Sequence, residues 1–100
     1  MGVDMLDLAF RIERRFGIKI AREDFRMLDE WASQRRPTSK PHDRTAGELH
    51  DWVVKLCEAR EVKVPHSSWN GVKFELAKTT GKPPQIIHRE TLIVRDLGFS

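Results

Sequence analysis

Residues 4–20 read DMLDLAFRIERRFGIKI, and their apolar side chains recur at the spacing of an amphipathic helix. The stripe, at intervals of three, four and four residues, consists of Met5, Leu8, Ile12 and Phe16. Gly17 supplies the residue type that adopts the left-handed conformation at helix ends. The pattern therefore predicts a helix over residues 4–16 and a short extended connector over residues 18–20.

Three further segments show helical patterns. Residues 21–31 predict a second helix with Phe25 and Leu28 facing inward. A third helix is predicted over residues 45–60, because it begins with Thr-Ala-Gly-Glu, a capping-box arrangement. A last long helix is expected to be capped by Ser67 or Ser68 and ended by Gly81.

The remaining segments are predicted to be loops. Residues 32–44 lack aliphatic periodicity and contain two prolines, which indicates a solvent-exposed loop. The tail after Gly81 carries apolar anchors and is expected to pack as a loop or one helical turn; residues 91–94 have no strand elsewhere to pair with. Gly71 indicates a close helix contact. The expected core comprises Leu8, Ile12, Phe16, Ile20, Phe25, Leu49, Trp52, Val53, Leu56, Trp69, Val72, Leu76, Ile86 and Leu97.

The composition is that of one small domain with a charged surface. The 100 residues are 39% apolar and 33% charged, with a formal net charge of +3. No apolar run reaches the roughly 18 residues of a membrane-spanning helix. The first residues include Asp4 and Asp7 rather than a basic leader, and Cys57 is the single cysteine. We therefore expect a soluble cytoplasmic domain without an intrachain disulfide.

The sequence contains no pattern typical of an enzyme or a metal site. The histidines, none of which stands at ligand spacing with a third ligand, are His42, His50, His66 and His88. No serine lies in a glycine elbow, and the six glycines form no phosphate loop. We therefore expect no catalytic residue and no bound metal.

Several segments resemble acyl carrier proteins, the phosphopantetheine-binding family. Residues 4–20 resemble the second helix of that family and its "EFGIEI" turn, and residues 45–53, TAGELHDWV, resemble the start of its last helix. Residues 69–81, the Pro-Pro-Gln-Ile at 83–86 and residues 94–98 resemble its first helix and the loop before the carrier serine.

The order of these segments differs from that of the family. Residues 1–60 resemble family helices two to four, whereas residues 67–99 resemble helix one and the following loop. The resemblance implies a single domain over residues 1–100, an all-α, acyl-carrier-protein-like bundle of three to four helices in circularly permuted order.

The resemblance places the family's prosthetic-group site at the two chain ends. The relic of the carrier motif consists of Gly2, Val3, Asp4, Asp96, Leu97 and Gly98. Gly2 falls on the position of the carrier serine, and glycine has no hydroxyl to bear 4′-phosphopantetheine. No cofactor is therefore expected. Two alternatives are phosphopantetheine on Ser100, which lies one position from the motif, and an acyl thioester on Cys57.

The predicted function follows from the charge of the first helix. The family's corresponding helix is acidic and is recognised by basic partners, whereas the residues here are Arg11, Arg14, Arg15, Lys19 and Arg22. The resemblance thus implies a monomeric, non-catalytic interaction module of fatty acid or polyketide metabolism, whose protein partner has an acidic patch. The same arginines also fit a plain solvated helix face. Alternatives are a genuine acyl or peptidyl carrier and a nucleic-acid-binding module; the latter is disfavoured because the basic residues are spread along the chain.

Overall fold

The fold is all-α, as predicted. The computed structural model describes residues 3–35, 44–93 and 95–98. The elements of these residues are α1 (Val3–Phe16), α2 (Arg22–Arg35), α3 (Ala46–Ala59), α4 (Ser68–Thr80) and the short 3-10 helix η1 (Pro84–Ile86). Within these ranges the only β pairing is one isolated antiparallel bridge between Thr45 and Leu92. No described helix is long and apolar enough to cross a membrane.

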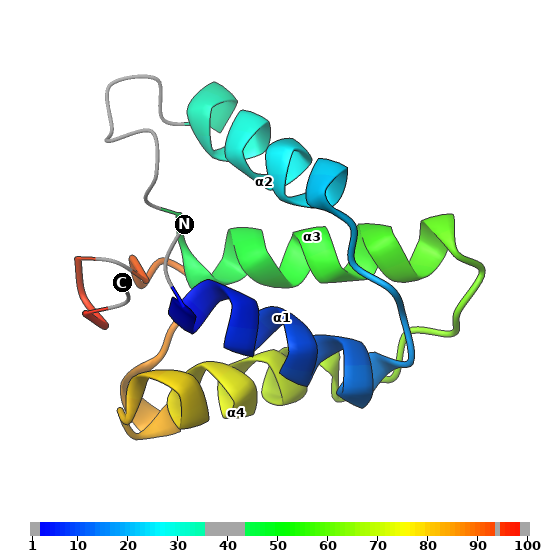
Figure 1. Ribbon diagram of the computed structural model, residues 1–100. Helices are drawn as coiled ribbons and strands as arrows, with labels where there is room; N and C mark the ends of the chain where they lie inside the picture. The colour runs from blue at the N-terminus through cyan, green and yellow to red at the C-terminus, as the bar shows by residue number, and fades with distance from the viewer. Residues whose placement is uncertain (1–2, 36–43, 94, 99–100) are drawn as a thin grey trace.

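The helices form a small bundle with α3 in the middle of the view (Figure 1). α2 lies above α3, while α1 and α4 lie below it and run in opposite directions (Figure 1). α4 packs against both α1 and α3, and α2 packs against α3. The beginning of α1 and the last described segment, residues 95–98, lie at the same end of the view. The expected approach of Gly98 to Gly2 lies outside the described residues.

α1 ends as the sequence predicts. Gly17 adopts a φ of 68° and donates its backbone N–H to the Glu13 carbonyl at 2.8 Å. The Glu13 carboxylate then accepts the backbone N–H of Ile20 at 2.7 Å, which holds the connector against the end of the helix. Ile18 is buried and Ile20 packs partly on the core, so the connector is part of the packed structure.

α2 is longer than predicted. It continues through residues 32–35, which the sequence analysis placed in a loop. These residues, Ala-Ser-Gln-Arg, include three good helix formers, and the first proline of the segment stands only at position 37. Because proline restricts the residue before it, helix is still permitted up to residue 35. At the other end of the expected loop, Arg44 is buried rather than solvated. Residues 36–43 lie outside the described part.

The capping box at the start of α3 is confirmed. The Thr45 hydroxyl accepts the Glu48 backbone N–H at 3.0 Å, and the Glu48 carboxylate accepts the Thr45 backbone N–H at 2.8 Å. This reciprocal pair satisfies donors that a helix leaves unpaired in its first turn.

The tail completes the cap of α3. The backbone N–H groups of Ala46 and Gly47 donate to the carbonyls of Thr91 and Arg89, each at 2.8 Å. A Cβ at position 47 would lie 2.9 Å from the Arg89 carbonyl oxygen, so the close approach requires glycine. The tail is thus a packed loop, but residues near 91–93 do find a backbone partner, which the sequence analysis did not expect.

α4 begins differently from the prediction and ends as predicted. Ser67 occupies the N-cap position, but its side chain makes no capping bond, and Ser68 lies inside the helix. Neither serine side chain caps the helix, because the Ser68 hydroxyl bonds His50 instead. Gly81 ends the helix with a φ of 74°. At Gly71 a Cβ would lie 3.0 Å from Cδ of Arg15, which confirms the close contact with α1.

Most predicted core residues are buried. The predicted side chains in the core are Leu8, Ile12, Phe16, Leu49, Trp52, Val53, Leu56, Val72, Leu76 and Leu97, with Ile20, Phe25 and Trp69 packed partly against them. The prediction that Ile86 is buried is wrong, because its side chain is 48% exposed and Ile87 is buried in its place. η1 closes with a bond from the Ile87 N–H to the Pro84 carbonyl, and this turn directs the second isoleucine inward. The core also contains Ile18, Leu28, Ala46, Cys57, Ile87 and Ile93.

Candidate functional site

The predicted partner-binding residues fall into two groups. Arg11 and Arg15 lie beside α4 and form ion pairs with it. Arg14 is exposed on α1, Lys19 is exposed in the connector, and Arg22 is exposed as the first residue of α2. The structure therefore brings Arg11 and Arg15 together, whereas the other three cations are presented separately to solvent.

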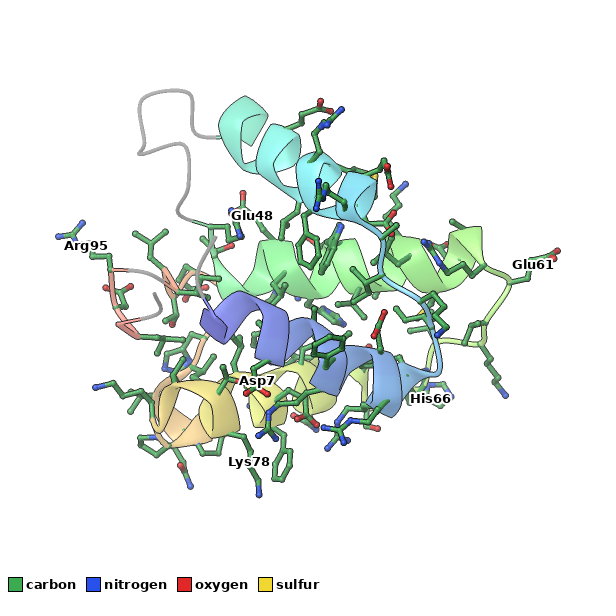
Figure 2. All side chains as sticks on the ribbon, in the orientation of Figure 1. Asp7, Glu48, Glu61, His66, Lys78 and Arg95 are labelled. Carbon is green, nitrogen blue, oxygen red and sulfur yellow. The ribbon has the colours of Figure 1, made fainter. Side chains whose placement is uncertain are left out.

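A buried carboxylate joins α1 to α4. The Glu75 side chain is only 9% exposed, and its Oε2 accepts Nε of Arg15 at 2.6 Å. Its Oε1 lies 3.9 Å from Nη1 of Arg11, whose Nε also donates to the Asp7 carboxylate at 3.0 Å. In Figure 2, Asp7 points from α1 toward α4. These contacts hold two guanidinium groups in fixed positions at the surface.

One exposed phenylalanine, Phe74, adjoins these cations, and a second, Phe10, lies elsewhere on α1. The Phe74 side chain is 46% exposed, and the Arg15 guanidinium and Nζ of Lys78 lie 5.1 and 5.3 Å from its ring centroid. Phe10 of α1 is 59% exposed. Neither ring was predicted from the sequence as a site residue. The available signal was that Phe74 lies off the Trp69, Val72 and Leu76 stripe.

We call this surface the α1–α4 face. It consists of Phe10, Arg11, Arg14 and Arg15 of α1 with Phe74 and Lys78 of α4. Its cations outnumber the two carboxylates beside it, those of Asp7 and Glu75, so the face is positively charged. Aromatic rings next to fixed guanidinium groups are the composition of energetically important protein interfaces.

A second polar cluster links the tail to α3 and α4. Nε2 of His50 lies 2.8 Å from the Ser68 hydroxyl, and Nδ1 of the same ring lies 2.9 Å from Nη1 of Arg89. Nη2 of Arg89 donates to the Asp51 carboxylate at 2.8 Å. Arg89 and His50 both pack on the Trp69 ring, with centroid distances of 5.5 and 5.6 Å. The sequence analysis missed this cluster because its members come from three separate segments.

The geometry of this cluster does not activate the serine. Arginine donates only, so Nδ1 of His50 accepts the Arg89 hydrogen bond and the ring proton resides on Nε2. His50 then donates to the Ser68 hydroxyl and does not accept its proton, which a catalytic base must do. Burial, with the nearby Arg89 charge, lowers the pKa of His50 from its ordinary value of 6.5. This cluster is suited to holding the tail in place.

The described residues of the predicted carrier-motif relic contribute to local structure. Val3 and Asp4 form the first turn of α1. Asp96 accepts the Leu92 backbone N–H at 2.9 Å and closes a turn of the tail, and Leu97 is buried. Gly98 has a φ of 69°. Gly2 and Ser100 lie outside the described residues.

The other candidate residues are placed as follows. Cys57 is fully buried in the core, and burial raises the pKa of its thiol, which makes it a poor acceptor for an acyl group. His66 and His88 are exposed, and His42 lies in a segment that is not described. In the described ranges no three metal-ligating side chains gather. The thioester alternative therefore receives no support from the geometry.

Comparisons with protein-family models, with curated proteins and with solved structures found no match. The resemblance to acyl carrier proteins thus rests on the segments quoted above. The structure itself shows the general class of the protein: a small all-α bundle with a positively charged helix face that includes exposed aromatic rings.

Proposed function

We propose that this protein is a non-catalytic interaction module that binds an acidic region of a partner protein through the exposed side of α1. The observation that carries the proposal is that cations of α1 are exposed or held at the protein surface. The inner side of the helix is filled by core residues, while Arg14 is exposed and Arg15 is fixed at the surface by Glu75. Lys19 and Arg22 add exposed positive charge just beyond the helix.

Preorganised cations favour binding. A guanidinium group that is already held in position loses less conformational entropy when a partner carboxylate arrives. Arg11 and Arg15 are held in this way by Asp7 and Glu75. Complementary charge also raises the encounter rate and excludes partners with a basic surface.

The proposal includes an acyl-carrier-protein-like architecture in permuted order without the prosthetic group. The antiparallel packing of α1 and α4 supports it, as does the capping box at the start of α3 (Figure 1). Glycine at the position that corresponds to the carrier serine favours binding over acyl transfer. Incubation with a phosphopantetheinyl transferase and coenzyme A should therefore leave the mass of the protein unchanged. A gain of the phosphopantetheine mass on Ser100 would establish the carrier alternative instead.

Capture from the native lysate tests the binding surface. The test variant combines Arg14→Glu, Lys19→Glu and Arg22→Glu, which reverse exposed charges without breaking the Glu75 ion pairs. The control is Arg26→Glu, on an exposed position of α2. An acidic protein captured by the wild type and the control, but lost by the test variant, supports the proposal. Capture that disappears after nuclease treatment, or that all variants share, contradicts it.

A further inference from the structure

The two exposed phenylalanines lie at the two borders of one continuous surface. One row of α1 positions, spaced by about 40° or less around the helix axis, consists of Phe10, Arg14, Asp7, Arg11 and Arg15. Arg15, at one end of this row, contacts two residues of α4: the Glu75 carboxylate and the Phe74 ring. The row therefore leads from one exposed ring across four polar side chains to the other exposed ring.

The apolar area on this face is not explained by the fold. Phe10 and Phe74 are among the few large apolar side chains that remain exposed in the described part of the chain. Two cations hold the Phe74 ring in place, since Arg15 and Lys78 lie 5.1 and 5.3 Å from its centroid. Lys78 projects from α4 away from α1 (Figure 2). Exposed rings with fixed surroundings are typical anchors of a protein interface.

The charges indicate which partner fits the face. Arg11 and Arg15 are partly neutralised by Asp7 and Glu75, whereas Arg14 and Lys78 form no ion pair with the described residues. Affinity for a phosphate backbone grows with the number of phosphates that are neutralised, and two unpaired cations are few for that purpose. A second copy meeting the same face would bring like charges together. A partner that combines carboxylates with apolar side chains satisfies both features.

The form of that partner follows from the fold. One way in which an extended peptide binds is by adding to an unpaired strand edge, and the described residues hold only one isolated bridge. A helix instead presents apolar residues at positions i, i+3, i+4 and i+7, with charged residues beside them. Such a stripe fits two rings that lie on neighbouring antiparallel helices.

We propose that the α1–α4 face binds an acidic amphipathic helix of a partner protein. Its apolar stripe contacts Phe10 and Phe74, and its carboxylates pair with Arg14, Lys78 and the outer edge of the Arg15 guanidinium. The inference rests on the proposed function, because it specifies the partner for the same side of α1.

The test uses a synthetic helical peptide as the probe. The peptide has about 20 residues, enough for helix formation, with leucines at i, i+3, i+4 and i+7 and glutamates elsewhere. Fluorescence anisotropy measures its affinity for the full chain, and amide chemical-shift changes locate the binding site. Matched peptides carry serine in place of leucine or glutamine in place of glutamate. Double-stranded RNA and anionic phosphatidylserine vesicles serve as competing classes of ligand.

Two pairs of variants separate the apolar and the charged contributions. Phe10→Ser and Phe74→Ser should each weaken binding about fivefold or more, as expected for interface anchors. Arg14→Glu and Lys78→Glu should weaken it similarly and reduce its salt dependence. All four positions are exposed, so the fold should survive, which circular dichroism checks. Arg26→Glu on α2 should leave the affinity unchanged.

The outcomes distinguish this inference from the proposed function. Loss of binding in the charge variants alone would mean a purely electrostatic face; the inference would then fail while the proposed function stands. No binding of the peptide would also overturn the inference, and lysate capture would still decide the proposed function. Tighter binding of RNA or vesicles through the same residues would overturn both.

Discussion

Glu75 of α4 forms ion pairs with both Arg11 and Arg15 of α1. Its buried carboxylate faces two guanidinium groups, so its removal takes away the ion pair of Arg15 and leaves Arg11 with the Asp7 pair. Glu75→Ala is expected to lower the free energy of unfolding by about 1–3 kcal/mol. Arg11→Ala removes only the 3.9 Å contact and a half-exposed pair with Asp7, and should cost less than about 1 kcal/mol. Urea denaturation measures both; equal effects would show that the buried carboxylate has no special role.

His50 makes the stability depend on pH. Burial and the charge of Arg89 hold its pKa below 6.5 in the folded state, so the unfolded chain binds its proton more readily. The contribution of His50 to stability is therefore fully present above pH 6.5 and is lost as the pH falls through the lowered pKa. His50→Gln should reduce the loss of stability between about pH 7 and 5. Thermal unfolding across that range provides the measurement, and an unchanged pH slope in the variant would exclude His50 as the responsible group.

At the scale of the elements, the tail approaches α3 closely at Gly47, which has the least room for a Cβ atom among the described glycines. A methyl group at position 47 would lie 2.9 Å from a backbone carbonyl, which cannot rotate away as a side chain does. Gly47→Ala is therefore expected to displace the tail and to cost about 1–3 kcal/mol, although alanine favours helix. Amide hydrogen exchange should show faster exchange at Ala46 and position 47, whose N–H groups donate to the tail. Arg89→Ala, which keeps the accepting carbonyl, should leave that exchange slower than in Gly47→Ala.

Local signals in the sequence predicted most element boundaries. The capping box at Thr45 starts a helix, and Gly17 and Gly81 end helices, through contacts with nearby residues only. All three were found as predicted. The extension of α2 was not predicted, because residues 32–35 lack an apolar stripe and precede two prolines, although their composition permits helix.

Contacts between distant segments were less accessible to sequence analysis. The Ser68–His50 bond replaced the predicted serine cap, and it depends on how α3 and α4 pack. The exposure of Phe10 depends in the same way on which side of α1 meets its neighbours. A pattern of apolar residues predicts that a helix has a buried side, but the partner helix determines where that side ends.

At the scale of the whole molecule, the order of the segments can be tested by changing it. The start of α1 and residues 95–98 lie at the same end of the view, and residues 61–66 connect α3 to α4 without helix, with Val62 and Val64 packed partly on the core (Figure 1). A protein with Ser100 joined directly to Gly2 by a new peptide bond and opened within residues 61–66 should fold to the same helical content. It would then carry the segments in the order that the proposed resemblance to acyl carrier proteins implies.

The rejoined protein also tests the site that the carrier resemblance implies. Gly2→Ser in the present chain leaves the hydroxyl on a free end, where two chain ends supply the flanking residues, and should give little modification. The same substitution in the rejoined protein places the hydroxyl in a continuous loop before a helix N-terminus, whose N–H groups favour a phosphodiester. Mass spectrometry after incubation with a phosphopantetheinyl transferase and coenzyme A should then show the added group. A rejoined protein that folds but gains no such mass would mean that position 2 does not correspond to the carrier serine, whereas the α1–α4 face would keep its own test.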